Sequence, residues 1–137
     1  MSLTPGVRLG RYEIRSQIGS GGMGEVYLAW DSDLDRTVAL KILPTTIAAD
    51  PDRMRRFVQE TKAASALNHP NILIVHDVGR SDSIPYMVTE HVQGETLRTR
   101  LRQGPLPLAE ALDVSVQIAS ALAEAHHAGH AQRVLQQ

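Results

Sequence analysis

The sequence predicts an α+β fold in which a five-stranded antiparallel sheet and one packed helix are followed by two further helices. Residues 12–43 alternate between apolar and polar side chains around a glycine-rich interruption, which is typical of half-buried strands joined by a turn. Apolar residues then recur at helical spacing beyond Pro51, and the residues after 93 have a helical pattern. These three observations define the fold class.

The first strand is predicted from Tyr12, Ile14 and Ile18, which alternate with polar residues until the glycine-rich stretch at 19–24 interrupts them. The later strands are expected at 25–30, 37–43, 72–78 and 86–90. A solvated turn is expected at 31–37 and a polar hairpin at 79–85.

The first helix begins near Pro51, because Asp50 has the residue type of an N-cap and proline suits the first helical position. It ends at the sequence HPN, residues 69–71. A short helix is expected at 95–102 and a long helix at 108–128, with Gly129 as the C-cap of the latter.

Composition excludes several classes of function. The 137 residues carry a formal net charge of -1 and no cysteine, so they offer no disulfide and no thiolate metal site. A nearly neutral chain favours neither nucleic acid nor an acidic membrane as its partner. The N-terminus lacks the apolar core of a signal peptide, and no apolar run approaches the roughly 20 residues that cross a bilayer. We therefore expect a cytoplasmic protein that binds neither nucleic acid nor membrane.

The strongest motif is GSGGMGEV at residues 19–26, which fits the pattern G-x-G-x-x-G-x-V. It joins two expected strands, whereas the dinucleotide-binding version joins a strand to a helix. A hairpin of this kind can fold over a triphosphate, because the missing side chains let backbone N–H groups approach phosphate oxygens. The alternative interpretation is an ordinary glycine-rich hairpin.

Two charged residues add to this motif. Ala39 and Lys41 share one face of their strand, so Ala39 can cover a flat base while Lys41 presents its ammonium to phosphates; the alternative is a lysine at a strand end that reaches water. Glu60 lies on the same helical face as Phe57 and Ala64. A carboxylate on an apolar face needs a partner, and Lys41 is the candidate, the alternative being a solvated glutamate at the margin of that face.

Taken together, these residues resemble the small lobe of a protein kinase. The likeness is greatest to the bacterial serine/threonine kinases and spans about residues 10–129. It is carried by RYEIRSQIGSGGMGEVYLAWD, VALKIL, RFVQETKAASALNHPNI and YMVTEHVQGETL. On this resemblance, residues 1–92 form a small lobe with a glycine-rich loop and a hinge, and residues 93–137 form a helical segment.

The resemblance also implies a nucleotide site, in which Ile18 and Val26 enclose adenine together with Ala39. The other implied roles are the phosphate flap of Gly19, Gly21 and Gly24, the phosphate contact of Lys41 and its pairing with Glu60, the gatekeeper Thr89, the hinge carbonyl of Glu90, the hinge N–H of Val92 and the ribose contact of Glu95.

The pattern departs from the family near the end of the sequence. The family continues into G-I-V-H-R-D-L-K-P-E-N, whereas this chain has GHAQRVLQQ from Gly129. Val134 occupies the position of the catalytic Asp, and valine can neither accept a proton nor orient a hydroxyl. The 137 residues also contain no match to the metal-binding Asn and Asp of the family. We therefore expect weak ATP binding, no Mg²⁺ site within the chain and no protein phosphorylation by it.

The long predicted helix has one narrow polar stripe and is mostly apolar elsewhere, which is typical of a buried helix. We therefore expect residues 95–128 to be covered by a second copy of the chain or by another protein. The stripe consists of Glu110, Asp113, Gln117, Ser120, Glu124 and His127.

His126 and His130 are four residues apart, a spacing that can place two imidazoles on one metal ion. Gly129 is expected to end the helix between them, so we predict no metal site. A second hypothesis for function is a hydrolase of esters or phosphoesters, at a cleft that oligomerisation lines with His126, His127 and His130. A third is a piece of a working serine/threonine kinase, against which the altered tail argues.

Overall fold

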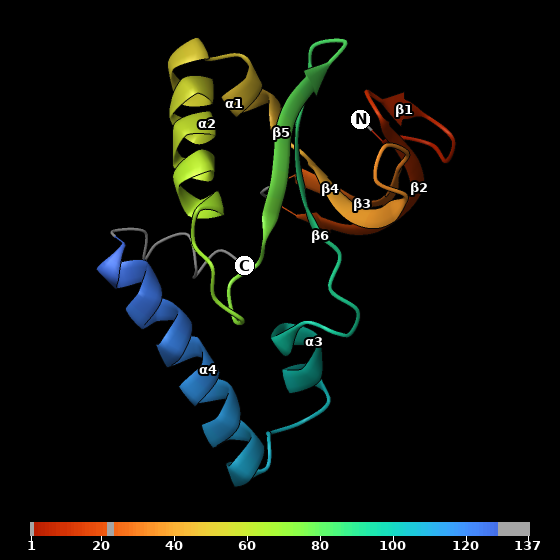
Figure 1. Cartoon of the computed structure of the whole chain (residues 1–137). Helices are drawn as coiled ribbons and strands as arrows, with labels where there is room; N and C mark the ends of the chain where they lie inside the picture. Colours follow the sequence, from red (N-terminus) through yellow and green to blue (C-terminus); the bar gives the residue numbers. More distant parts are fainter. Residues whose placement is uncertain (1, 22–23, 129–137) are drawn as a thin grey trace. The chain divides into compact units, whose positions relative to one another are not determined.

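The fold of the chain was analysed in a computed structural model, shown in Figure 1, which describes residues 2–21 and 24–128. Two compact units are present. One contains the chain up to Ala66 together with Ile74–His91, and the other contains Leu67–Leu73 together with the chain from Val92 onward. The division after His91 lies next to the boundary expected after residue 92, but the sequence did not predict that 67–73 belongs to the second unit.

The first unit is built on a curled antiparallel sheet, to which the described residues contribute six strands in the order β1-β2-β3-β4-β6-β5. The strands are β1 (Arg8–Leu9), β2 (Tyr12–Gly21), β3 (Gly24–Asp31), β4 (Arg36–Ile42), β5 (Val75–Ser81) and β6 (Ile84–Glu90). The α+β class is confirmed. The strand beyond the expected five is β1, whose two residues pair with β2 and are too few to leave a periodic pattern.

The glycine-rich stretch does not interrupt the first long strand where we expected it to. β2 continues to Gly21, because Gly19 pairs with Val26 and Gly21 pairs with Gly24 in the ladder to β3. β5 also differs from its prediction, since it begins at Val75 rather than at residue 72.

The hydrophobic core of the first unit lies on one face of this sheet. Alternate residues of β3 and β4 are buried, as expected for strands with one face on the core. The rings of Tyr12 and Tyr86 meet edge to face within it, with their centroids 5.9 Å apart. The buried cluster consists of Leu9, Tyr12, Ile14, Tyr27, Ala29, Val38, Leu40, Tyr86 and Val88.

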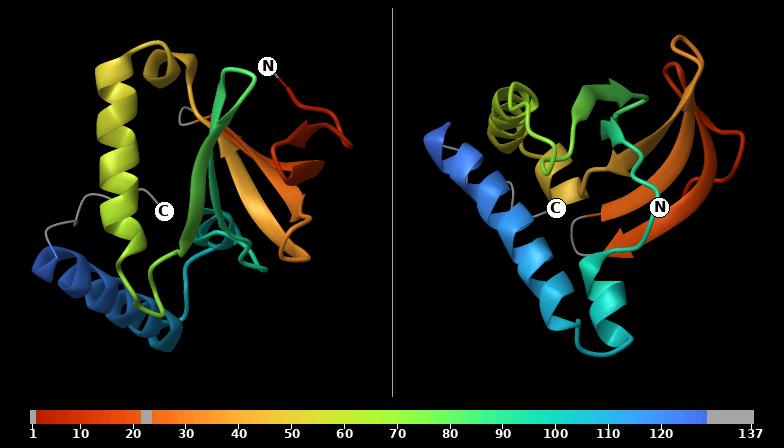
Figure 2. Two further views of the ribbon diagram at one scale, coloured as in Figure 1. Left: turned by 45° about the horizontal axis from the view of Figure 1, so that its top comes forward. Right: turned by 60° about the horizontal axis from the view of Figure 1, so that its bottom comes forward.

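Two helices of the first unit follow β4. α2 (Pro51–Ser65) begins as predicted, because the Asp50 side chain accepts the backbone amides of Asp52 and Arg53 at 3.0 and 3.3 Å. α2 lies along β5, as the views in Figure 2 show. The preceding helix α1 (Thr45–Ala48) was not predicted, since a single turn has no amphipathic repeat.

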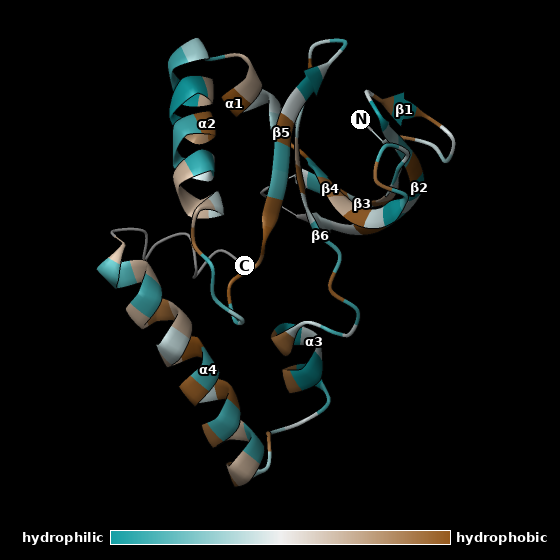
Figure 3. Cartoon of the chain, viewed as in Figure 1, coloured by the Kyte–Doolittle hydropathy of each residue, from teal (hydrophilic) through white to brown (hydrophobic). Residues whose placement is uncertain are grey.

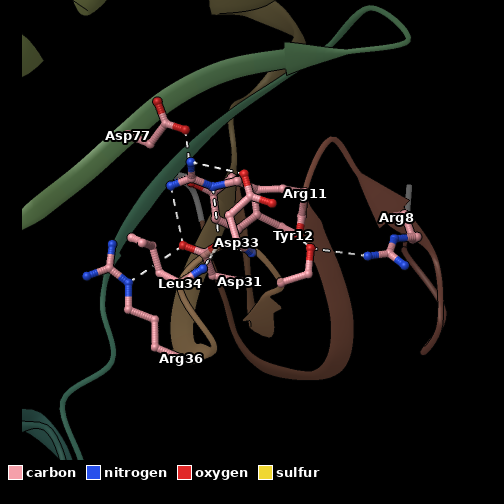
Figure 4. Close-up of polar contacts among 9 residues, drawn as sticks. Arg8, Arg11, Tyr12, Asp31, Asp33, Leu34, Arg36 and Asp77 are labelled. Atoms are coloured by element: carbon pink, nitrogen blue, oxygen red, sulfur yellow. Dashed lines mark hydrogen bonds and ion pairs between the residues drawn. The ribbon is translucent and has the colours of Figure 1, made fainter.

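The connection between β3 and β4 is the exposed turn that we expected, formed by residues 32–35, but Asp31, where we expected this turn to begin, ends β3 and is fully buried, with 0% of its surface exposed. Its carboxylate lies 3.2 Å from the Nε of Arg11 and 3.6 Å from the Nε of Arg36. The same carboxylate accepts the backbone amides of Asp33 and Leu34 at 3.1 and 3.3 Å (Figure 4). Two cations and two N–H donors therefore compensate the buried charge, and they tie the residue before β2, the first residue of β4 and the turn to one side chain.

The connection between β5 and β6 is tighter than the polar hairpin expected at 79–85. Strand pairing continues to Ser81 and Ile84, so only Asp82 and Ser83 lie outside the ladder. Both have positive φ, 48° and 67°, and two successive residues in this region form the two-residue turn that matches the twist of a hairpin. Both side chains are exposed.

The helices of the second unit are α3 (Leu97–Arg102) and α4 (Leu108–His127). The Thr96 hydroxyl caps α3 by accepting the amide of Thr99 at 3.1 Å. Ala128 is the C-cap residue of α4, and Gly129, the expected cap, lies outside the described residues. No helix in the described part of the chain combines the length and the apolar character needed to span a membrane.

The polar stripe of α4 makes contacts within the second unit, both to the 67–73 segment and to α3. The contacts are Asn71 Nδ2 to Gln117 Oε1 at 3.0 Å, His69 Nε2 to the Ser120 hydroxyl at 2.9 Å, and Arg100 to the Glu110 carboxylate at 3.2 Å. An apolar strip of α4 is left exposed instead, visible as recurring brown segments in Figure 3. Leu108, Leu112 and Val116, one helical turn apart, are 75%, 58% and 67% exposed.

Candidate functional site

The sheet face opposite the core carries most of the predicted site residues of the first unit. The ladders pair Ala39 with Leu28 on one side and with Thr89 on the other, and cross-strand partners share a face. Two residues further along β4, Lys41 pairs with Val26 on one side and with Met87 on the other. We call this surface the open face, and it consists of Val26, Leu28, Ala39, Lys41, Met87 and Thr89. Thr89 is buried, and the other five are half-buried.

Lys41 is the one ionisable residue of the open face. Burial lowers the pKa of its ammonium, because removal from water penalises the charged form. Glu60 lies on α2 with an exposed side chain. The pairing of Lys41 with Glu60 therefore stays a prediction, and Lys41 lies where a bound anion would be strongly stabilised.

The glycines of the β2–β3 hairpin differ in whether the fold itself requires glycine at their position. Gly24 has a φ of 106°, and a Cβ built on it would overlap the carbonyl oxygen of Ile42, so the fold itself requires glycine there. A Cβ on Gly19 would meet only Val26, at an ordinary contact distance of 3.8 Å. The fold does not require Gly19, which is consistent with close approach by a ligand. Gly21 pairs with Gly24 at the end of the hairpin, and residues 22–23 lie outside the described chain.

Ile18 lies on β2 directly before Gly19 and is exposed. At the other side of the open face, the predicted hinge begins at the end of β6. The Thr89 hydroxyl donates to the Glu90 carbonyl at 3.1 Å. Glu90 in turn bonds Ile74 twice, since its amide donates to the Ile74 carbonyl and its carboxylate accepts the Ile74 amide, both at 2.9 Å. The Glu90 side chain and amide are thereby used in fixing the end of β6, and its carbonyl, which has a second lone pair, is the group left for a ligand contact.

The last two predicted nucleotide contacts, Val92 and Glu95, belong to the second unit. Val92 is 64% exposed, and the Glu95 carboxylate accepts the side-chain amide of Gln103 at 3.1 Å. The predicted site residues thus divide between the two units at the point where the hinge was expected.

The histidines considered as metal ligands form no cluster in the described chain. His126 and His127 are exposed in the last turn of α4, whereas His130 and Val134 lie outside the described residues. Among the described residues, no group of three or more His, Cys, Asp or Glu side chains has the geometry to hold a metal ion.

Chemically, the open face offers a half-buried apolar surface, one lysine and a neighbouring glycine hairpin. This combination suits a flat apolar ring attached to a polyanion, because the ring packs on aliphatic side chains while the ammonium and backbone N–H groups attract the charge. Sequence reasoning omitted Leu28 and Met87 from this face. The alternation within β3 would have placed Leu28 beside Val26, but Met87 becomes a neighbour of Lys41 only through the β4–β6 register.

Comparison with known proteins identifies one family. The protein kinase domain family matches residues 12–135. The serine/threonine-protein kinase PrkC of Bacillus subtilis is 50% identical over 118 residues, which cover 85% of this chain and 18% of PrkC. The serine/threonine-protein kinase PknA of Mycobacterium tuberculosis is 43% identical over 136 residues, which cover 94% of this chain and 32% of PknA.

Solved structures agree with the sequence relatives. The crystal structure of the Mycobacterium tuberculosis PknI kinase domain matches with a TM-score of 0.83 at 35% identity, over 93% of this chain and 52% of that one. The chain therefore spans about half of a solved kinase domain, and much less of the curated relatives.

Proposed function

The chain belongs to the protein kinase domain family, and on that premise we propose that it is the ATP-binding part of a bacterial serine/threonine kinase. The observation that carries the proposal is Lys41. It is a half-buried cation on a face that the core does not use, and burial lowers the pKa of its ammonium. Keeping such a lysine costs stability, and a bound polyphosphate is the ligand that offsets this cost.

The proposed binding mode uses the residues of the open face and its two borders. Val26, Ala39 and Ile18 pack against adenine, and the β2–β3 hairpin lies over the phosphates, with Gly19 allowing its backbone to come close. Lys41 neutralises the α- and β-phosphates. The remaining proposed contacts are the Glu90 carbonyl and the Val92 N–H at the adenine edge, Thr89 as gatekeeper, Glu95 at the ribose, Gly21 and Gly24 in the phosphate flap, and Glu60 as the partner of Lys41.

We further infer that the 137-residue chain tested alone binds ATP weakly and transfers no phosphate. The open face covers one side of the base only, which limits the apolar area that adenine buries. Val134 stands where the family has its catalytic Asp, and the chain contains no match to the Mg²⁺ ligands on which phosphoryl transfer depends. In this sense the chain is a pseudokinase-like nucleotide-binding module.

Calorimetric titration of the 137-residue chain with a non-hydrolysable ATP analogue, with and without Mg²⁺, tests this proposal. The sequence has two lysines, Lys41 on β4 and Lys62 on α2, so each provides a matched control for the other. We expect Lys41→Met to weaken binding of the analogue by at least about tenfold, or ~1.4 kcal/mol. Lys62→Met should leave the affinity for the analogue unchanged. We expect Mg²⁺ to have little effect.

Two results would count against nucleotide binding: no heat change at millimolar analogue, or equal weakening by both lysine variants. If the chain phosphorylates a generic protein substrate, the interpretation as a piece of a working kinase replaces the pseudokinase-like one. Hydrolysis of a chromogenic ester or phosphoester that is lost on chelation or in His126→Ala would instead favour the hydrolase hypothesis.

A second proposed property is self-association through residues 95–128, and the exposed strip of Leu108, Leu112 and Val116 favours it. Contiguous apolar surface of this kind marks an interaction site, and the polar stripe of α4 is already used within the unit. We expect light scattering after size-exclusion chromatography to give a dimer or larger species. Leu112→Glu should shift it to the monomer, whereas Asp113→Ala, at the next residue on the stripe, should not. A compact wild-type monomer would contradict this proposal, and association with a different protein would then be the remaining interpretation.

A further inference from the structure

The residues that precede β1 lie against the core of the first unit, and we call residues 2–7 the N-terminal strap. Two backbone bonds of 2.8 Å attach its end to β2, because the Gly6 amide donates to the Ile14 carbonyl and the Val7 carbonyl accepts the Ile14 amide. Leu3 and Val7 are half-buried and pack against the buried cluster. The strap is therefore a packed part of the fold.

The beginning of the strap is bonded to β3 through the Tyr27 hydroxyl. The Leu3 amide donates to this hydroxyl at 2.9 Å, and the hydroxyl donates to the Glu25 carboxylate. The Ser2 hydroxyl donates to the second oxygen of the same carboxylate at 3.3 Å. Tyr27 is fully buried, and burial together with its bond to Glu25 raises the pKa of its hydroxyl, which therefore remains a donor at neutral pH. Ser2 and Leu3 are thus both tied to the Glu25 side chain, one directly and one through Tyr27.

Glu25 lies close to the end of the β2–β3 ladder. It pairs with Ser20, and the next pair, Gly21 with Gly24, is the last one. Alternate residues of β3 from Tyr27 onward are buried in the core, so Glu25, two residues earlier, is on the core side of the strand. The strap therefore holds the glycine hairpin from the side opposite the open face.

Packing alone supports this end of the hairpin incompletely. A cavity of about 230 Å³ is lined by Leu3, Gly24 and Glu25 and by residues from the end of β4, from α1 and from the start of β6. Groups that line a cavity lack partner atoms on that side. The hydrogen bonds from the strap therefore have a larger share in fixing the start of β3 than they would have in a filled core.

We propose that the N-terminal strap is a positioning segment for the phosphate side of the nucleotide site. By holding Glu25 through Ser2, Leu3 and Tyr27, it fixes the hairpin where its backbone can approach the phosphates. A hairpin that is already fixed loses less conformational entropy when nucleotide binds, so the strap raises affinity without contacting the nucleotide. This role rests on the proposed function, and its effect on a ligand with phosphates should exceed its effect on adenosine.

Tyr27→Phe removes the shared hydroxyl and keeps the ring in the core. Tyr12→Phe is the matched control, since Tyr12 belongs to the same buried cluster and its hydroxyl bonds a different carboxylate, that of Asp77 at 2.9 Å. NMR of the ¹⁵N-labelled 137-residue chain without nucleotide measures amide hydrogen exchange. We expect exchange at residues 24–26 to become faster relative to residues 38–40 in Tyr27→Phe but not in Tyr12→Phe.

Titration of the same variants with the ATP analogue and with adenosine, followed by the amide signals, measures the effect on the site. Tyr27→Phe should weaken binding of the analogue at least about threefold more than binding of adenosine, whereas Tyr12→Phe should affect both equally. If Tyr27→Phe does not fold, Ser2→Ala, at an exposed residue, carries the test with a smaller effect in the same direction.

Two results would overturn the role of the strap and leave the nucleotide site intact: unchanged exchange at residues 24–26 in Tyr27→Phe, or equal weakening of the analogue and adenosine by this variant. A wild-type chain that binds neither ligand would overturn the nucleotide site itself, and the bonds of the strap would then be structural alone.

Discussion

On β4, Leu40 is fully buried in the core, whereas its neighbour Lys41 is half-buried on the open face. The core face is filled by aromatic and aliphatic side chains, and the fully buried charge of Asp31 is compensated by two arginines and two backbone amides. The open face instead has a lysine that burial disfavours. The difference indicates that packing determines the residues of the core face, whereas packing does not explain Lys41 on the open face, which we have proposed to bind nucleotide.

The largest expected effect is a difference in stability between variants of two adjacent residues, one on each face of the sheet. Leu40→Ala should lower the free energy of unfolding by about 3 kcal/mol, because it leaves a cavity in a closely packed core. Lys41→Met should leave stability unchanged or raise it slightly, since it removes a half-buried charge. Urea denaturation followed by circular dichroism measures both. An equal loss for the two variants would show that the open face is also structural.

A smaller contrast is expected between two glycines of one motif. Gly24→Ala should cost about 2 kcal/mol, since alanine is strained at this φ and its Cβ overlaps the Ile42 carbonyl. Gly19→Ala should change stability by less than about 0.5 kcal/mol but should weaken binding of the ATP analogue. Thermal unfolding and calorimetric titration separate these effects, and a stable Gly24→Ala chain would show that the hairpin can shift to make room.

The smallest effect concerns pH. Burial lowers the pKa of His76 in the folded chain, with Arg36 acting in the same direction and Glu90 and Asp31 opposing it. The unfolded chain therefore binds this proton at a higher pH than the folded chain does, and stability should fall as the pH drops below about 6.5. The loss should stay below about 1 kcal/mol, because solvent screens a half-buried group. In His76→Gln, unfolding curves at pH 7 and pH 5 should lie closer together than in the wild type; an unchanged separation would assign the loss to other groups.

The sequence predicted the elements with long periodic patterns and the capped start of α2, because alternation, helical spacing and a capping aspartate are local signals. It did not predict β1 or α1, which are too short to show a period. Asp31 was assigned to solvent because it begins a polar run, and only the arrangement of β2 beside β3 brings Arg11 to it. The burial of the Thr61 hydroxyl depends on how α2 packs, and the bulge at His76 depends on the register of β5 with β6, neither of which a local pattern encodes.

The β3–β4 and β5–β6 connections have different consequences for protein engineering. Between β3 and β4, the Asp31 carboxylate holds the backbone of the turn and the side chains of Arg11 and Arg36, so added residues would separate groups that compensate a buried charge. Between β5 and β6, the turn is two exposed residues long and their positive φ suits glycine or asparagine. A fluorescent tag or an affinity peptide is therefore better spliced in at 82–83 than at 32–35, and a linker rich in glycine would join it to the strands with little strain.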